Sequence, residues 1–136
     1  MNDIGFEIGE NTKVVGPIFT NAKVKIGKNC WIGKNLIING IGTVVIGDNC
    51  DIAPEVTFLT GGHALGDKKR RAGQGHIYHI EVGNGTWIGA RATILNDTAI
   101  GDSCVIAACS CVNKNVEENT LVGGVPARTI RALTDD

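Results

Sequence analysis

The sequence predicts an all-β fold, a parallel β-helix of short strands and sharp corners in a single domain covering residues 1–136. Three observations favour this fold. An aliphatic residue returns every six positions, small or turn-forming residues follow it, and bulky side chains are scarce. With 19 glycines and an aromatic content of only 4%, the chain suits a narrow interior with many turns better than a bulky core.

The six-residue repeat justifies the strands in order. Its period matches neither a 3.6-residue helix nor a sustained two-residue alternation, so it indicates a short strand, a corner and another short strand. Glycine and asparagine at the corners tolerate positive φ. Stacked coils would lie about 4.8 Å apart. The inward positions are Ile8, Val14, Thr20, Ile26, Ile32, Ile38, Ile46, Ile52, Phe58, Val82, Ile88, Ile94, Ile100, Ile106 and Val112.

The repeat is interrupted twice. The spacing from Ile38 to Ile46 is eight, so "NGIG" is expected to bulge at one corner. Between Phe58 and Val82 we expect a long loop, about 60–81, to leave the coil. Long loops in compact domains are uncommon unless they are functional. His63, within "TGGHAL" and soon after a rung of the repeat, is therefore the first candidate for chemistry.

Cysteines and charge limit the class of protein. Cys30, Cys50 and Cys104 occupy the small-residue position of the repeat, which predicts buried thiols. In "CSC", Cys109 and Cys111 could instead form a redox or metal-binding pair. A net charge of -1 gives no reason to expect nucleic acid or a membrane surface as partner. No signal peptide and no apolar run of about 20 residues is seen, and we expect a cytoplasmic protein.

Repeats such as "IGDNCD", "IGARAT" and "IGDSCV" resemble the hexapeptide-repeat acyltransferases. The segments "IGDNCDIAPEVTFLTGGH", "VGNGTWIGARATI" and "GGVPARTIR" are most similar to the galactoside and maltose-type sugar O-acetyltransferases. The resemblance is strong from about residue 44 to 131, whereas residues 1–43 match only as repeats. It implies triangular, left-handed coils; ordinary crossover connections favour the opposite hand. We also expect a short C-terminal helical tail.

The resemblance implies an acetyl-CoA-dependent O-acetyltransferase that moves an acetyl group directly to a hydroxyl of a sugar or glycan of the cell-surface polysaccharide type. His63 would be the catalytic base, because imidazole titrates near neutrality and can pass the hydroxyl proton to the leaving thiolate. A backbone N–H near Ala90 would bind the oxyanion. Asn35 and Asn39, on the earlier coils, would hold the acceptor.

The resemblance also implies a coenzyme groove in which small residues admit the pantetheine arm and cations meet the phosphates. The residues that match are Trp87, Ala90, Ala108, Asn113, Lys114, Arg128 and Arg131. The basic run in "DKKRR" is interpreted as a solvated loop or as a means of steering anionic ligands. About five coils offer a limited core, and the long loop has little to pack on. The resemblance implies a homotrimer with active sites between chains.

Three alternatives stay open. The first is N-acetylation of an amino sugar. The second is a zinc enzyme similar to the gamma-class carbonic anhydrases, with His63, His76 and His79 as ligands, although the first two lie closer in sequence than in that family. The third is a non-catalytic solenoid used for assembly. Our preferred interpretation expects no metal.

Overall fold

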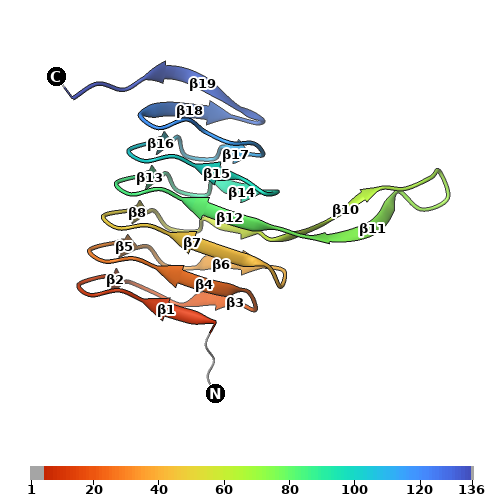
Figure 1. The fold of residues 1–136 in the computed structure, drawn as a ribbon, viewed down its shortest axis with the longest axis horizontal. Helices are drawn as coiled ribbons and strands as arrows, with labels where there is room; N and C mark the ends of the chain where they lie inside the picture. Colours follow the sequence, from red (N-terminus) through yellow and green to blue (C-terminus); the bar gives the residue numbers. More distant parts are fainter. Residues whose placement is uncertain (1–4, 136) are drawn as a thin grey trace.

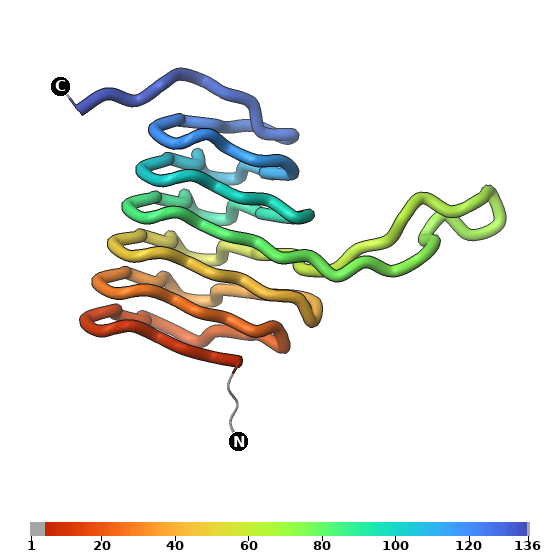
Figure 2. The backbone as a smooth tube through the Cα atoms, viewed as in Figure 1, coloured from red at the N-terminus to blue at the C-terminus, as the bar shows by residue number. Residues whose placement is uncertain are grey.

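The computed structural model describes residues 5–135, which wind into a stack of triangular coils with one arm projecting from its side (Figure 1). Each coil contributes one strand to each of three parallel sheets, and two of these sheets contain five strands, so five coils are complete. The chain rises from the first coil to the last without crossing back (Figure 2). Residues 5–135 contain no helix, and hence none that could cross a membrane.

The three sheets form the sides of a prism. Sheet A consists, in stacking order, of β1 (Phe6–Ile8), β4 (Lys23–Ile26), β7 (Thr43–Ile46), β12 (His79–Val82) and β15 (Ala99–Ile100). Sheet B consists of β2 (Lys13–Val14), β5 (Trp31–Ile32), β8 (Asp51–Ile52), β13 (Trp87–Ile88), β16 (Val105–Ile106), β18 (Thr120–Gly124) and β19 (Ala127–Ala132). Sheet C consists of β3 (Ile18–Thr20), β6 (Leu36–Asn39), β9 (Thr57–Leu59), β14 (Thr93–Leu95) and β17 (Cys111–Val112). The bends are named the A–B, B–C and C–A corners after the sheets they join.

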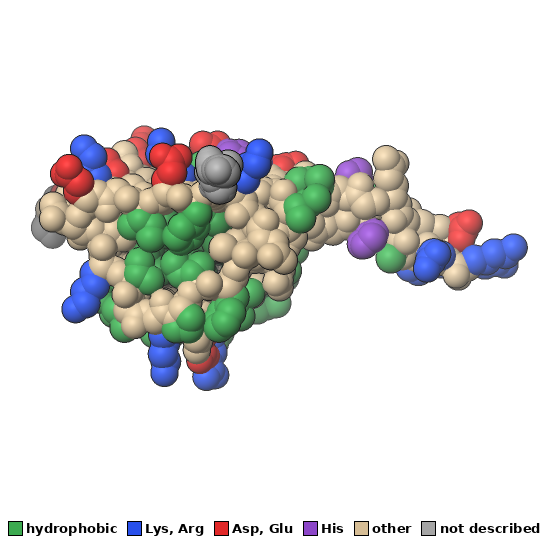
Figure 3. Space-filling model, turned by 90° about the horizontal axis from the view of Figure 1, so that it is seen from below, with side chains coloured by type: hydrophobic (Ala, Val, Ile, Leu, Met, Phe, Trp, Pro, Cys, Tyr) green, Lys and Arg blue, Asp and Glu red, His purple; other side chains and the backbone are tan. Residues whose placement is uncertain are grey.

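The predicted six-residue repeat is the interior of the prism. In sheet B, Ile32, Ile52, Ile88 and Ile106 are in register on successive strands, and all four side chains are buried. Burial is lost only towards the first coil, which has no described neighbour beneath it: the Ile8 side chain is 41% exposed. The view from below accordingly shows apolar side chains across this end of the prism (Figure 3).

Small side chains beside these aliphatics tie the coils together. At the A–B corner, the Cys50 thiol donates to the Gly83 carbonyl oxygen of the next coil (3.1 Å), and the Thr86 hydroxyl donates to the Gly101 carbonyl oxygen (2.9 Å). The predicted buried thiols are confirmed, and all five cysteines are free. Burial raises the pKa of the Cys50 thiol to about 11, which keeps its S–H available as a donor.

The corners turn through left-handed backbone, as predicted. Positive φ recurs three residues after the inward aliphatic residue, at Asn11, Asn29, Asn35, Asn49 and Asn119 among others. At the A–B corner, side chains also satisfy the amides of the coil before. The Asp48 amide donates to Asn84 Oδ1 (2.8 Å), and the Asn84 amide donates to Asp102 Oδ1 (2.7 Å).

The predicted loop at 60–81 is an antiparallel β-hairpin of β10 (Gly61–Leu65) and β11 (Ala72–Ile77) that projects from the C–A corner (Figure 1). Its ends meet at the prism, where the Tyr78 amide donates to the Thr60 carbonyl oxygen (2.7 Å). The coil then resumes, because β12 pairs with β7 residue for residue. The hairpin is thus an insertion that leaves the stacking of the frame intact.

The predicted C-terminal helical tail is wrong. The chain reverses at Gly124, where φ is 103°, and passes the cis peptide bond Val125–Pro126. It then runs back as β19, antiparallel to β18. The physical reason is that β18 is the last parallel strand of sheet B, so its outer edge offers unpaired backbone groups that a helix would have left open.

Candidate active site

His63 lies on β10, near the base of the hairpin, and its side chain is exposed. Its Nδ1 atom is 2.9 Å from the carbonyl oxygen of Gly73. A carbonyl oxygen can only accept a hydrogen bond, so in the neutral ring Nδ1 carries the proton and Nε2 keeps its lone pair. The imidazole is therefore held in the tautomer that a general base requires.

A register shift positions that carbonyl. His63 pairs with Gly75, but Leu65 pairs with Ala72, so β11 contains an extra residue between the two pairs. A β-bulge of this kind bends its strand and re-aims nearby groups. A Cβ atom at Gly73 would lie 2.8 Å from the Ala64 carbonyl oxygen, which explains the glycine at this position. Sequence analysis did not identify Gly73, because its contribution is a backbone carbonyl.

A hollow of about 590 Å³ lies beside His63, within the usual size range of small-molecule sites. Its lining comes from the hairpin and from the corner between β6 and β7, and includes Asn39, Ile41 and Ile77. Of the two predicted acceptor residues, the structure therefore brings Asn39 to His63. Asn35 lies instead at the B–C corner, where it has a φ of 60°.

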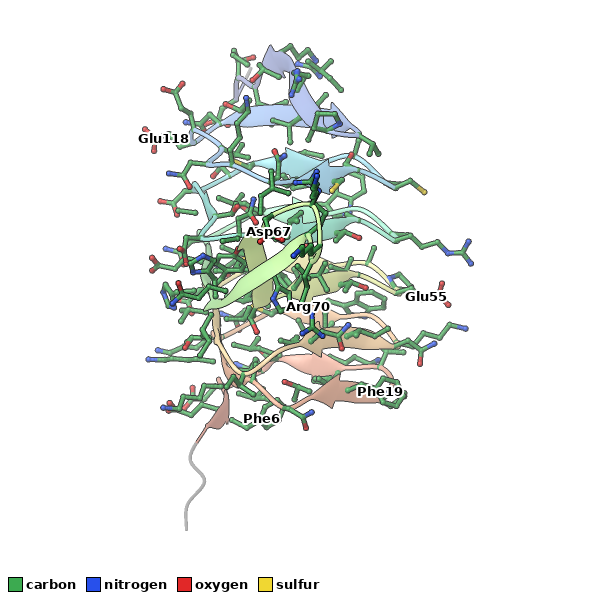
Figure 4. All side chains as sticks on the ribbon, turned by 90° about the vertical axis from the view of Figure 1, so that its right-hand side faces the viewer. Phe6, Phe19, Glu55, Asp67, Arg70 and Glu118 are labelled. Carbon is green, nitrogen blue, oxygen red and sulfur yellow. The ribbon has the colours of Figure 1, made fainter. Side chains whose placement is uncertain are left out.

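A second hollow on the hairpin joins His63 to the basic tip. It is lined by His63, Gly66, Asp67, Arg70, Ala72, Gly73 and Gln74. Asp67 Oδ1 accepts hydrogen bonds from the amides of Lys69 (2.9 Å) and Arg70 (3.3 Å), which fixes the turn. Figure 4 shows the hairpin end on, with its tip, marked by Asp67 and Arg70, facing the viewer. Glu118 and Glu55 mark the A–B and B–C corners on either side of it.

The other two histidines have separate neighbours. His76 pairs with Gly62 and so lies on the opposite face of the hairpin from His63; its ring stacks on Tyr78 with the centroids 6.3 Å apart. His79 lies on the outside of sheet A, with Nε2 3.6 Å from Glu81 Oε2. Within residues 5–135, no three His, Cys, Asp or Glu side chains are grouped so that they could hold a metal ion.

The predicted oxyanion donor lies at the B–C corner. Ala90 and Ala108 occupy equivalent positions on successive coils, and the Cys109 amide donates to the Ala90 carbonyl oxygen (2.9 Å). At the A–B corner the corresponding amides are capped by Asp or Asn side chains of the next coil. Ala108 has no side-chain acceptor, and in the described part of the chain the Ala90 N–H has no partner. That N–H is free to bind a ligand oxygen.

The same corner holds backbone strain. Glu55, Arg91 and Cys109 follow one another up the B–C corner with φ values of 63°, 60° and 63°. Left-handed backbone costs such residues on the order of 1–3 kcal/mol each, and strain of this kind often marks functional sites. The Arg91 guanidinium, with Nε 2.8 Å from Glu55 Oε1, also lowers the pKa of the Glu55 carboxyl.

The remaining predicted coenzyme residues lie in two further places. Trp87 and Arg131 are on the outer face of sheet B, and the Trp87 side chain is 55% exposed. Asn113, Lys114 and Arg128 line a hollow of about 550 Å³ at the C-terminal end of the prism. None of the seven coenzyme residues lines either hollow that contains His63.

Thr60 supports the candidate site and was not identified from the sequence. Its buried hydroxyl donates to the Asn39 carbonyl oxygen (2.8 Å) and accepts from the Gly42 amide (3.0 Å). These bonds fix the start of the hairpin against the coil before it. The signal in the sequence was its position, because this threonine lies between the last inward residue before the loop, Phe58, and the two glycines.

Comparisons with known proteins agree with this architecture. Residues 79–114 match the model of the bacterial transferase hexapeptide (six repeats), and residues 23–53 match that of the hexapeptide repeat of succinyl-transferase. The chain is 38% identical over 130 residues to galactoside O-acetyltransferase of Escherichia coli. The alignment covers 94% of this chain but only 64% of that protein. The chain thus spans less than two thirds of that relative.

Two solved structures are also similar. A hexapeptide-repeat containing acetyltransferase from Vibrio cholerae, complexed with acetyl-CoA, has a TM-score of 0.85 and 32% identity, over 96% of this chain and 72% of that one. A galactoside acetyltransferase in complex with coenzyme A has a TM-score of 0.84 and 37% identity, over 95% and 66% of the two chains. With its repeat, its coiled frame and these relatives, the chain belongs to the hexapeptide-repeat acetyltransferase family.

Proposed function

We propose that this protein is an acetyl-CoA-dependent O-acetyltransferase that acts on a hydroxyl of a sugar or glycan, with His63 as general base. The observation that carries the proposal is the Nδ1 contact of His63 with the Gly73 carbonyl oxygen, which leaves Nε2 to accept a proton. The similarity to a galactoside O-acetyltransferase and to a structure complexed with acetyl-CoA supports the donor and the class of acceptor.

The transfer is direct. Nε2 of His63 takes the proton of the acceptor hydroxyl as its oxygen forms a bond to the thioester carbonyl carbon. The carbonyl oxygen becomes an oxyanion, for which the free N–H of Ala90 is a donor. The carbon–sulfur bond then breaks, the imidazolium returns the proton to the thiolate, and the products are an acetyl ester and coenzyme A.

The active site forms between copies of the chain in this proposal. Neither hollow at His63 contains Ala90, Trp87 or the C-terminal cations. The hairpin itself projects from the prism with Leu65 and Ile77 exposed by 83% and 63%. A two-stranded hairpin with exposed apolar side chains gains little stability alone, so a neighbouring copy is its natural support. A closed homotrimer would place each His63 at the B–C corner of the next copy.

The coenzyme groove then runs from the B–C corner towards the C-terminal end. Small Ala90 and Ala108 leave room for the pantetheine arm, and Trp87 offers an exposed ring beside them. Lys114 and Arg128 lie together in one hollow, where their charges suit the phosphates of coenzyme A.

Release of free coenzyme A in the presence of acetyl-CoA and a panel of sugars tests the activity. We expect sugar-dependent release and a hydroxylamine-sensitive ester product. A hydroxylamine-resistant amide would assign the transfer to an amino group instead. No detectable binding of acetyl-CoA at millimolar concentration by isothermal titration would contradict the whole proposal and leave a non-catalytic solenoid.

The placement between copies is tested by mixing two inactive variants. His63→Ala removes the base, and Ala108→Asn blocks the Ala90 N–H by supplying a side-chain acceptor of the kind seen at the A–B corner. Co-expressed chains that assort at random should regain activity in about a quarter of their sites, because only those combine an intact hairpin with an intact corner. A site built within one chain would regain none.

A further inference from the structure

The glycines of the hairpin fall into two groups. A Cβ atom at Gly62 would lie 3.0 Å from the Tyr78 ring, and one at Gly73 would lie 2.8 Å from the Ala64 carbonyl oxygen. Gly61 and Gly75 differ from these. A Cβ atom at Gly61 would meet nothing nearer than 3.7 Å, and one at Gly75 nothing nearer than 3.9 Å, which is ordinary van der Waals contact. Neither residue has a positive φ.

The described chain therefore gives no reason of its own for glycine at these two positions. Glycine in a strand is unfavourable, because it loses more backbone entropy on folding and has no side chain to pack. Glycine within a strand often marks a bulge, a bend, or a site where a ligand or another backbone approaches closely. The bulge of β11 lies between Gly75 and Ala72, and both Gly61 and Gly75 are in regular pairs outside it. The absence of side chains at Gly61 and Gly75 then serves a molecule from outside this chain.

Both glycines flank the imidazole of His63. Gly75 pairs directly with His63, and Gly61 precedes it by two residues and pairs with Ile77. Residues opposed across strands, and residues two apart along a strand, share one face. Gly61, His63, Gly75 and Ile77 therefore lie on the same face of the hairpin. A methyl group at residue 75 would stand about 4.5–5.5 Å from the Cβ atom of His63, directly beside the ring.

This face is the floor of the hollow beside His63. Ile77 and Ile41, the latter 70% exposed, supply apolar walls, and Asn39 supplies a polar edge. Apolar walls with a few polar groups are typical of sites that bind small organic molecules. A protein side chain from a neighbouring copy in the same space would instead cover the proton-accepting ring.

We propose that Gly61 and Gly75 determine acceptor specificity, by leaving a side-chain-free slot in which a hydroxyl borne on a ring carbon reaches His63. This inference rests on the proposed function. A base must lie within about 2.6–3.2 Å of the hydroxyl oxygen. At that distance a secondary hydroxyl brings its ring carbon and both neighbouring substituents against the hairpin, and they need the space that two methyl groups would fill. A primary hydroxyl on a free arm needs much less. The acceptor class is therefore a pyranose or similar ring that reacts through a secondary hydroxyl.

The test uses Gly61→Ala, Gly75→Ala and the double variant, with Ala64→Ser as a control that adds one heavy atom to β10 outside both hollows at His63. Two acceptor probes are compared: a methyl 6-deoxyhexopyranoside, which has only secondary hydroxyls, and ethylene glycol, which has only primary ones. We expect the double variant to lose at least about tenfold in kcat/KM for the pyranoside, the scale on which pockets discriminate single methylene groups. Its activity on ethylene glycol, its melting temperature and its oligomeric mass should match the parent and the control.

If the double variant lost kcat/KM equally on both acceptors, or lost none on either, the proposed slot would be wrong. Dissociation of the oligomer in the alanine variants, seen by light scattering, would assign the space to a neighbouring copy and also overturn it. A parent that acetylates ethylene glycol but not the pyranoside would contradict the acceptor class. If the parent releases no coenzyme A with any acceptor, the proposed function is wrong, and the proposed slot is wrong with it. This outcome differs from failure of the slot alone, in which the parent is active and the glycine variants do not discriminate between the two acceptors.

Discussion

The carbonyl oxygen of Gly73 lies 2.9 Å from Nδ1 of His63, so the backbone of one hairpin strand sets the tautomer of a side chain on the other. Active-site histidines are commonly oriented by a carboxylate or a carbonyl in this way. Here the orienting group is part of a β-bulge and does not depend on a second titrating residue. The orientation of the His63 imidazole is thus a property of the hairpin register.

Replacement of His63 by Ala or Asn should slow acetyl transfer by roughly 10²–10⁴-fold, the usual contribution of a general base. Melting temperature and acetyl-CoA affinity should stay close to those of the parent, because His63 is exposed and lies in no hollow with the coenzyme residues. Steady-state kinetics and titration calorimetry check both points. His79→Ala, on the outside of sheet A, is the matched control and should keep its activity. A His63 variant that retains more than a tenth of the parental rate would mean that another group accepts the proton.

Capping the free amide at the B–C corner should separate activity from stability. Ala108→Asn places an acceptor over the Ala90 N–H, as Asp102 does over the Asn84 N–H, and should abolish most of the transfer while keeping or raising the melting temperature. Asp102→Ala should do the reverse, with a loss of about 0.5–1.5 kcal/mol in unfolding free energy and unchanged kcat. Chemical denaturation and kinetics on both variants provide the comparison. Full activity in Ala108→Asn would show that the Ala90 amide does not act in the reaction.

The anchor of the hairpin can be tested at Thr60. Thr60→Val keeps the shape of the side chain but leaves the buried Gly42 amide without its hydroxyl acceptor. The expected cost is about 1–3 kcal/mol in unfolding free energy. Faster hydrogen exchange at the base of the hairpin and a lower kcat should accompany it, since His63 loses its fixed position. Thr57→Val on the preceding strand should have little effect, because within residues 5–135 the Thr57 hydroxyl makes no hydrogen bond between coils. Similar exchange rates in the two variants would argue against an anchoring role.

Cysteine and threonine should be interchangeable at the small-residue position of the A–B corner, because both donate a hydrogen bond to the next coil. Cys50→Thr should leave the melting temperature nearly unchanged. Cys50→Ala, which removes a buried sulfur atom and leaves the Gly83 carbonyl oxygen without this donor, should cost about 1–2 kcal/mol. Equal stability of the two variants, measured by urea unfolding, would show that the hydrogen bond to the Gly83 carbonyl oxygen does not stabilise the fold.

The raised pKa of Cys50 also sets a pH dependence. An unfolded thiol loses its proton near its ordinary pKa of 9.0, whereas the folded thiol keeps it until about pH 11. Between these values the folded state binds the additional proton, so the unfolding free energy should fall as the pH rises through this window. Cys50→Thr should make the unfolding free energy fall less steeply with pH. Part of the fall should remain, because burial also raises the pKa of the Cys104 thiol. Melting curves from pH 8 to 11 would reveal whether the slope differs.

The frame could be predicted from the sequence because each inward residue reports its own position in a six-residue period. Ile52, Ile88 and Ile106 are spaced by the repeat and are buried as expected. The hairpin and β19 could not be predicted, since their strands contain no such period and exist through pairing with each other or with β18. Asn35 shows the corresponding limit for the site. An asparagine at a corner is selected for its left-handed backbone, so its side chain carries no information about an acceptor.

The hydrogen bond between the Tyr78 amide and the Thr60 carbonyl oxygen has an evolutionary consequence. The entropic cost of closing an insertion whose two ends are bonded to each other rises only slowly with its length. Recombination or drift can therefore lengthen, shorten or replace this arm without disturbing the rungs above and below it. In the proposed function the frame binds the donor and the arm selects the acceptor, so the two would be separately heritable. A lineage of such proteins could then acquire new acceptors while keeping one donor site.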